Sequence, residues 1–226
     1  MDLESEKRLA AERAVESIED GMIVGLGSGS TSAYAVRAIA RRMAAGLRIE
    51  AIPTSRETAE LAISLGIPLT DFDLHPHIDL TIDGADEVDG NLRAIKGGGG
   101  AFLREKIVAE ASSRMIAIVD SSKIVACLGA CKLPIEVLPF GTRPAQDSVA
   151  ALGARVALRL DKIGQPILTD QGNRILDAHF DRIDDPERLA AALDAMPAVL
   201  AHGLFLGQID LLIAAIGAAT KLTVRP

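Results

Sequence analysis

The sequence predicts an α/β protein in which a Rossmann-like parallel sheet with helices on both faces carries a smaller ferredoxin-like α+β subdomain. Helical and strand-like patterns alternate up to about residue 131, as parallel βαβ units require. From about residue 133 the order becomes strand, helix, strand, strand, helix, strand, which is typical of a ferredoxin-like unit. We therefore expect a Rossmann-like catalytic domain at 1–131 and 206–226, and the ferredoxin-like subdomain at 132–205.

The first half supplies the parallel sheet. Residues 5–19 have helical periodicity and end at Gly21, which suits a helix C-cap. Further helices are expected in "SGSTSAYAVRAIARRMA" and "SRETAELAISLG", and buried strands at 22–27, 47–53, 78–83 and 114–120. The apolar run "IDLLIAAIG" (209–217) suits a strand that returns to this sheet.

Ligands of such sheets bind at the carboxyl ends of the strands. Chemistry is therefore expected after Leu26, Pro53, Ile82 and Val119.

The second half supplies the subdomain. Strands are expected in "LPIEVLP", "RVALRL" and "AVLAHGLF", and helices in "RPAQDSVAALGA" and "DPERLAAALDAM". The segment "QPILTDQGNRILDAHF" predicts a hairpin that turns at Asp170 to Asn173.

Charge and composition exclude several classes of partner. The 226 residues have a formal net charge of -7, no Trp and one Tyr, which disfavours binding to nucleic acid or to an anionic membrane. The acidic N-terminal segment has no apolar run suited to a signal peptide, and no segment is long enough to span a membrane. Cys127 and Cys131 are expected to be buried free thiols in a reducing compartment. We expect a cytoplasmic protein.

The glycine-rich segment "GLGSGSTS" (25–32) lies between a predicted strand and a predicted helix. Unpaired N–H groups and the helix dipole at such a place favour an anion, and Ser28, Ser30 and Thr31 add hydroxyl groups. The spacing fits neither the dinucleotide fingerprint nor a P-loop. Phosphate monoester binding is the better fit, and a tight turn with a capping serine is the alternative.

Two carboxylates lie at the end of the third predicted strand, in "TIDGADEVDG" (81–90). Asp83 is the last residue of the strand, and Asp86 follows in a turn. The register does not fit an EF-hand loop. With Lys96, these carboxylates suit hydrogen bonding to sugar hydroxyls and proton transfer, although a D-G-x-D turn can be purely structural.

Four consecutive glycines follow Lys96 in "KGGGGAFLREK" (96–106). Their N–H groups can form a nest for a developing oxyanion. Glu105 shares an apolar helix face with Ala101 and Val108. Because this acid lies on an apolar face beside an anion-binding loop, Glu105 is a candidate general base. The alternative is that Glu105 only interacts favourably with the helix dipole or pairs with a neighbouring side chain. Whether burial raises its pKa or the helix terminus lowers it stays open at this stage.

In combination these segments resemble the type A ribose-5-phosphate isomerases. The resemblance covers nearly the whole chain and rests on the order of "GLGSGST", "TIDGADEVD", "IKGGGGAFLREKI", "VDSSK", "LPIEVLP", "TDQGNRILD" and "GLF". It implies a two-domain α/β fold and an isomerisation between ribose 5-phosphate and ribulose 5-phosphate that needs no metal and no cofactor. It also implies a homodimer or homotetramer.

The resemblance assigns roles residue by residue. Glu105 matches the proton-transferring base, and Asp83, Asp86 and Lys96 match the cluster that holds the sugar and assists ring opening. The substrate-contacting positions are Ser28, Gly29, Ser30, Thr31, Gly84, Ala85, Gly97, Gly98, Gly99 and Lys123. Departures are small: many members have threonine at Ser28 and alanine at Gly100.

Three rival functions are weighed at this stage. A sugar-phosphate sensor would keep the same pocket but would bring an effector such as a DNA-binding helix-turn-helix, and neither that nor a basic patch is found in the sequence. An NAD-dependent dehydrogenase is disfavoured by the glycine spacing. A sugar-phosphate aminotransfer or deamination is harder to exclude by pattern, but it lacks the resemblance.

Overall fold

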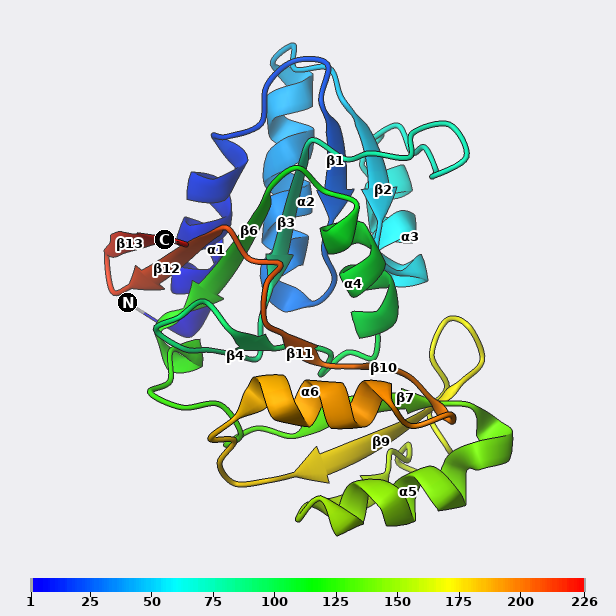
Figure 1. Ribbon diagram of the computed structural model, residues 1–226. Helices are drawn as coiled ribbons and strands as arrows, with labels where there is room; N and C mark the ends of the chain where they lie inside the picture. Colours follow the sequence, from blue (N-terminus) through cyan, green and yellow to red (C-terminus); the bar gives the residue numbers. More distant parts are fainter. Residues whose placement is uncertain (1, 226) are drawn as a thin grey trace.

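The computed structural model of the protein describes residues 2–225, and its largest element is a six-stranded sheet in the order β13-β12-β6-β3-β1-β2 (Figure 1). All neighbours in this sheet are parallel except β12 and β13. The strands are Ile23–Leu26 (β1), Glu50–Pro53 (β2), Leu80–Gly84 (β3), Met115–Asp120 (β6), Leu211–Ile216 (β12) and Ala219–Val224 (β13). The predicted parallel sheet, including its returning C-terminal strand, is confirmed.

Helices cover both faces of this sheet. Helices α1 (Leu3–Val15) and α2 (Ser30–Ala44) pack against each other and against one face, and α3 (Arg56–Ser64) lies beside β2. Helix α4 (Phe102–Glu110) covers the other face.

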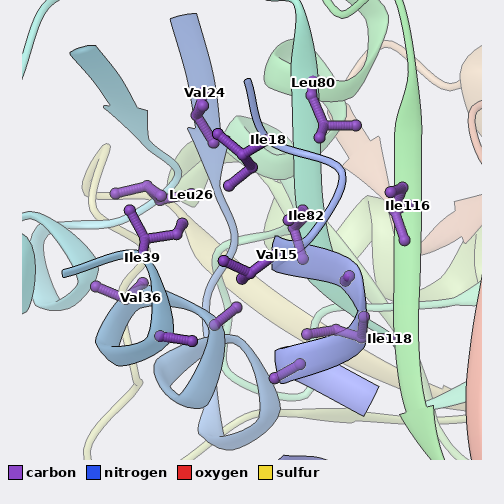
Figure 2. Close-up of a cluster of buried hydrophobic side chains, with 14 of the residues drawn as sticks. Val15, Ile18, Val24, Leu26, Val36, Ile39, Leu80, Ile82, Ile116 and Ile118 are labelled. Carbon is purple, nitrogen blue, oxygen red and sulfur yellow. The ribbon is translucent and has the colours of Figure 1, made fainter. Parts of the chain in front are cut away.

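Strand β6 is apolar from Met115 to Val119 because it packs against helices on both faces. Ile116 and Ile118 join the cluster beneath α1 and α2 (Figure 2). Met115 and Val119 alternate with them and pack in the cluster that contains Phe102 of α4. Because successive side chains of a strand point to opposite faces, a strand that is buried on both faces has no polar positions.

The second half forms a four-stranded antiparallel sheet in the order β10-β7-β9-β8, below the first sheet in Figure 1. Its elements are β7 (Leu133–Val137), α5 (Thr142–Ala151), β8 (Arg155–Leu158), β9 (Arg174–His179), α6 (Pro186–Asp194) and β10 (Val199–His202). This is the predicted ferredoxin-like order. Val149 of α5 and Leu193 of α6 share one apolar cluster with Ile135 of β7. The boundaries at 131/132 and 205/206 stay a prediction.

A small three-stranded sheet, which the sequence did not predict, lies between these two parts (Figure 1). It contains β4 (Glu87–Val88), β5 (Ala94–Ile95) and β11 (Leu204–Phe205). The run "AVLAHGLF" therefore forms two strands, β10 and β11, that are separated at Gly203. The amide of Gly203 donates to Pro134 O (2.8 Å), and its carbonyl accepts from Lys96 N (2.9 Å). A Cβ at Gly203 would lie 2.2 Å from Lys96 O, so this close approach requires glycine.

Three details differ from the predictions. The first helix ends at Val15, and Gly21 instead donates its N–H to Arg48 O at the entry to the sheet. The hairpin turns within 169–173, but its first arm pairs only through isolated bridges. Cys127 and Cys131 are free but half-buried.

No helix within residues 2–225 has the length and apolarity to cross a membrane.

Truncation of Ile118 tests the importance of the core beneath α1 and α2. We expect Ile118→Ala to lower the free energy of unfolding by about 2–5 kcal/mol, because it leaves a cavity where the side chain is fully buried. The measurement is denaturant unfolding, with Ile163→Ala, at an 82% exposed position, as the control. Equal effects of the two substitutions would contradict this account of the core.

Candidate active site

A pocket of about 140 Å³ opens at the carboxyl ends of the parallel strands. Its wall is formed by Lys7, Ser28, Gly29, Ser30, Thr31, Gly84, Ala85, Asp86, Lys96, Gly97, Gly98, Gly99, Glu105 and Lys123. Every candidate site residue from the sequence lies in this wall, except Asp83. The segments after Leu26, Ile82 and Val119 thus meet at one place with the glycine loop, as strand ends of a parallel sheet do. Within residues 2–225 the wall includes no residue of the segment directly after Pro53.

A buried group of three ionisable side chains lies at the pocket: Lys96 and Glu105 line its wall, and Asp83 lies behind it. The Lys96 ammonium lies 2.8 Å from Asp83 Oδ2 and 3.2 Å from Glu105 Oε2. The exposed fractions of Asp83, Lys96 and Glu105 are 0%, 2% and 5%. Lys96 also donates to the carbonyl of Gly84, and its ammonium lies 5.3 Å from the ring centre of Phe205. One cation is therefore shared by two carboxylates, and all three side chains are almost inaccessible to solvent.

Asp83 is positioned by the end of β3, which carries it, and by the close approach of Gly27 from the first loop. Its Oδ1 accepts hydrogen bonds from Ser28 N (3.0 Å), Ser32 Oγ (2.9 Å) and Gly84 N (2.7 Å). A Cβ at Gly27 would lie 2.0 Å from this oxygen. Gly27 therefore allows the first strand to approach Asp83. With both oxygens occupied, Asp83 holds Lys96 and the first loop from behind the pocket wall.

Glu105 lies in the first turn of α4, where its N–H donates to Ala101 O (3.0 Å). Val108, on the same helix face, is 2% exposed, which confirms that the face of Glu105 is turned inward. Within residues 2–225 the Glu105 carboxylate has no side-chain partner besides Lys96. Its oxygens therefore keep capacity to accept a proton.

Burial decides the question of the Glu105 pKa that the sequence left open. Desolvation raises the pKa of Glu105 from 4.5 to about 8; repulsion by Asp83 adds to the rise and attraction by Lys96 opposes it. Desolvation alone would lower the pKa of Lys96, but the carboxylates of Asp83 and Glu105 outweigh it and hold this pKa above 10.5. The group thus combines a fixed cation with a weakly acidic carboxyl group.

The opposite end of the pocket is suited to an anion. Gly29 precedes the first turn of α2, and Ser30 and Thr31 begin the helix. The first N–H groups of a helix lack intrahelical acceptors and favour negative charge. Lys123, in the short 3₁₀ helix Ser121–Lys123 after β6, contributes a cation. This end fits a phosphate group.

Ser28 has a different environment from the one expected for a substrate-binding hydroxyl. Its Oγ lies 2.7 Å from Thr54 Oγ1, 2.8 Å from Ser55 Oγ and 3.1 Å from Thr58 Oγ1. Its hydroxyl is therefore held in a cluster of hydroxyl groups at the start of α3. This cluster fixes the loop that carries Ser30 and Thr31, and it was not predicted because its members lie in separate segments.

Lys7 is a pocket residue that was not predicted, because it lies in an acidic, amphipathic helix far from the motifs in sequence. Its ammonium donates to Ser30 Oγ (3.2 Å) and to Glu4 Oε1 (2.7 Å). The neighbouring Glu6 accepts from Ser121 N (2.9 Å). This contact joins α1 to the segment of Lys123, so that two lysines face the same end of the pocket.

The glycine loop is held by Asp86, whose Oδ2 accepts from Gly98 N (2.8 Å). Gly97, Gly98 and Gly99 all line the pocket beside Lys96 and Glu105. In the part of the chain that the structure describes, no group of three or more His, Cys, Asp or Glu side chains is arranged to hold a metal ion.

The fold and the pocket define an α/β enzyme with an anion site at one end and a buried acid–base group at the other. The model of the family "Ribose 5-phosphate isomerase A (phosphoriboisomerase A)" matches residues 50–218. A Ribose-5-phosphate isomerase A from Sphingopyxis alaskensis is 54% identical over 213 residues, which cover 94% of this chain and 93% of the relative. One from Sinorhizobium fredii is 54% identical over 221 residues, 95% of each chain.

Solved structures agree with this relationship. A D-ribose-5-phosphate isomerase in complex with phospho-erythronic acid has a TM-score of 0.96 at 37% identity, with 100% of both chains covered. The ribose 5-phosphate isomerase A of Methanocaldococcus jannaschii has a TM-score of 0.93 at 35% identity and covers 98% of this chain and 99% of that one. The chain belongs to the ribose 5-phosphate isomerase A family and is an aldose–ketose isomerase.

Gly27→Ala tests the close approach of the first loop to Asp83. The added Cβ would lie 2.6 Å from Asp83 Cα, so the loop or the carboxylate must move. Misplacement of such groups by about 1 Å can reduce turnover by about a hundredfold, and we expect a loss of that size in a steady-state isomerase assay. Gly90→Ala, where no atom lies within 4 Å of the added Cβ, is the matched control. If the two variants had similar isomerase activities, the role of the close approach between Gly27 and Asp83 would be contradicted.

Proposed function

We propose that this chain interconverts ribose 5-phosphate and ribulose 5-phosphate through an enediolate, with Glu105 as the group that carries the proton. The observation on which this rests is the buried Lys96 that Asp83 and Glu105 share beside the glycine loop. The family supports the substrate, since the relatives are named for ribose 5-phosphate.

The phosphate is proposed to bind at the start of α2. There the N–H groups of Ser30 and Thr31 and the ammonium groups of Lys7 and Lys123 can contact its oxygens. This binding energy orients the carbons at the other end of the pocket, where Glu105 lies. Gly29, Gly84 and Ala85 complete the wall between the two ends.

Ring opening is assigned to Asp86 with Lys96. The resemblance matches both Asp83 and Asp86 to the ring-opening cluster. The geometry favours Asp86 for the proton transfer, because it lines the pocket and Asp83 does not. Asp86 Oδ2 is engaged by Gly98 N, and its other oxygen can accept the proton of the anomeric hydroxyl. As the C1 carbonyl forms and the bond from C1 to the ring oxygen breaks, the proton taken by Asp86 is returned to the ring oxygen, while the Lys96 ammonium donates a hydrogen bond to that oxygen and stays a cation.

The isomerisation then needs one carboxylate. Glu105 takes the proton from C2, and the electron pair of that C–H bond forms the C1–C2 double bond as negative charge moves to O1. Lys96 and the glycine N–H groups stabilise this charge. Glu105 delivers its proton to C1, O2 becomes the carbonyl oxygen, and the O2 proton passes to O1. No redox cofactor or metal is required by this balance.

We further propose that the only ligand is a small sugar phosphate, with no nucleic-acid or membrane partner, and that the protein is a cytoplasmic homodimer or homotetramer. The negative net charge of -7 supports the first statement. Sedimentation equilibrium tests the oligomeric state: a monomer at micromolar concentration would contradict it.

Glu105→Gln tests the base. The variant should fold and bind inorganic phosphate as the wild type does, but lose about 10²–10⁴-fold in kcat, because the amide cannot accept the proton. Ribulose 5-phosphate formation is measured in excess chelator, with Glu110→Gln at the end of the same helix as the control. A folded Glu105→Gln variant that keeps more than a tenth of wild-type activity would contradict the assignment of Glu105 as the general base. Loss of activity of the wild type in excess chelator would contradict the metal-free mechanism. A wild type that binds sugar phosphate without turnover would favour the sensor.

The pH dependence of kcat/KM provides a separate test. This parameter reports the ionisation of the free enzyme, in which Glu105 has a pKa raised to about 8 by burial. Glu105 must be deprotonated to act, so kcat/KM should rise about tenfold per pH unit below 8 and level off above it. Above about pH 6.5 the substrate phosphate is already a dianion and does not contribute. A profile that is flat from pH 6.5 to 9 would contradict the raised pKa.

A further inference from the structure

An arginine of the ferredoxin-like part reaches the glycine loop of the active site. Arg159 follows β8 directly, and its backbone N–H donates to Ile175 O of β9 (2.8 Å). Its Nη1 donates to two carbonyls of the loop, Gly97 O (3.2 Å) and Gly98 O (3.0 Å). A side chain about 60 residues away in sequence thus contacts the back of the oxyanion-binding segment.

Asp177 of β9 holds this arginine in place. Arg159 Nε lies 3.1 Å from both carboxylate oxygens of Asp177, and Nη2 also donates to Oδ1. Both side chains are largely buried, with exposed fractions of 13% and 8%. A planar guanidinium that is bound on two edges has little freedom to rotate. The four-stranded sheet, which carries Asp177 in β9, therefore fixes the positions of the two loop carbonyls.

The carbonyl of Gly98 and the N–H of Gly99 belong to the same peptide group. Because a trans peptide is planar, these two groups point in opposite directions. The carbonyl points to Arg159, and Gly99 lies in the pocket wall with Lys96 and Glu105. Within residues 2–225 the N–H groups of Gly97 and Gly99 have no acceptor, whereas that of Gly98 is taken by Asp86. Of the two free donors, only that of Gly99 belongs to a peptide group whose carbonyl is bound by Arg159.

We propose that Arg159, held by Asp177, is a positioning residue that orients the Gly99 N–H toward the oxygen that becomes negative in the enediolate. A run of glycines has many accessible backbone conformations, and a donor stabilises developing charge best when its direction is fixed beforehand. Arg159 supplies this constraint from outside the pocket. The inference rests on the proposed isomerase mechanism and adds a second unit of the fold to it.

Arg155 provides a matched control, because it lies four residues earlier, in β8, and also pairs with an aspartate. Its Nη1 and Nη2 each lie 2.8 Å from an oxygen of Asp181, but its side chain is 71% exposed and contacts no loop carbonyl. The same substitution at the two positions therefore separates the loss of an arginine–carboxylate pair from the loss of the loop contact.

The test compares Arg159→Lys with Arg155→Lys. Lysine keeps the charge but, as a single ammonium, cannot hold Asp177 on one edge and two carbonyls on the other. We expect Arg159→Lys to lower kcat about tenfold to a hundredfold, which does not exceed the loss in kcat caused by removing one oxyanion-hole donor. The KM for ribose 5-phosphate should change less than about threefold. Arg155→Lys should keep wild-type values.

Binding measurements by calorimetry distinguish orientation from general damage. Phospho-erythronic acid carries a carboxylate next to its hydroxyl-bearing carbons and so presents negative charge at the reacting end. Arg159→Lys should weaken its binding about tenfold or more, whereas the affinity for inorganic phosphate should stay the same. If Arg159→Lys does not fold, Arg159→Gln with Asp177→Asn removes both charges and leaves no unpaired buried carboxylate; the same losses are expected.

Three results would overturn the inference: an unchanged kcat in a folded Arg159 variant, an equal loss of phosphate and phospho-erythronate binding, or the same loss in Arg155→Lys. Each of these can occur while the wild type isomerises its substrate and Glu105→Gln does not. An inactive wild type would instead count against the proposed function.

Discussion

The burial of one ammonium group between two carboxylates is the constraint on which the rest of the site depends. Lys96 is 2% exposed, and an isolated charge at such a place would be strongly unfavourable. Asp83 offsets this cost as a fixed counter-ion, because its other oxygen is occupied by three donors. Lys96 is thus already paired with Asp83 when Glu105 approaches it as a second carboxylate. Because the attraction of Lys96 does not outweigh burial and repulsion by Asp83, Glu105 can take up and release a proton at a pH near its raised pKa of about 8.

Each part of the fold contributes to this arrangement. The parallel sheet brings Asp83 and the anion-binding start of α2 together, and α4 turns Glu105 inward toward them. The backbone of Lys96 is tied to Gly203, which connects the small three-stranded sheet with β10. The ferredoxin-like sheet contacts the glycine loop through Arg159. The second half of the chain is thereby a part of the active site rather than an appended unit.

Much of this could be predicted from the sequence, because the signals are local. Alternating apolar runs and helical periods predicted the sheets, and Asp83, Asp86, Lys96 and Glu105 lie in two adjacent motifs. The remainder depends on contacts between distant segments. The place of Lys7 in the pocket depends on the packing of α1 against α2 and β6 and on the contact of Glu6 with Ser121. The orientation of the Ser28 hydroxyl depends on Thr54, Ser55 and Thr58. Strands of two residues, such as β4 and β5, are too short to leave a periodic pattern.

The most direct test of the account is a titration of the Glu105 carboxyl group itself. Carbon-13 NMR of protein labelled at the glutamate carboxyl carbons would follow it, and the Glu105 signal is the one that is absent from Glu105→Gln. The account predicts a midpoint near pH 8, because burial and Asp83 together outweigh the attraction of Lys96. A midpoint at or below the ordinary 4.5 would show that Lys96 holds Glu105 as a permanent anion, and would contradict its role as the proton carrier described here.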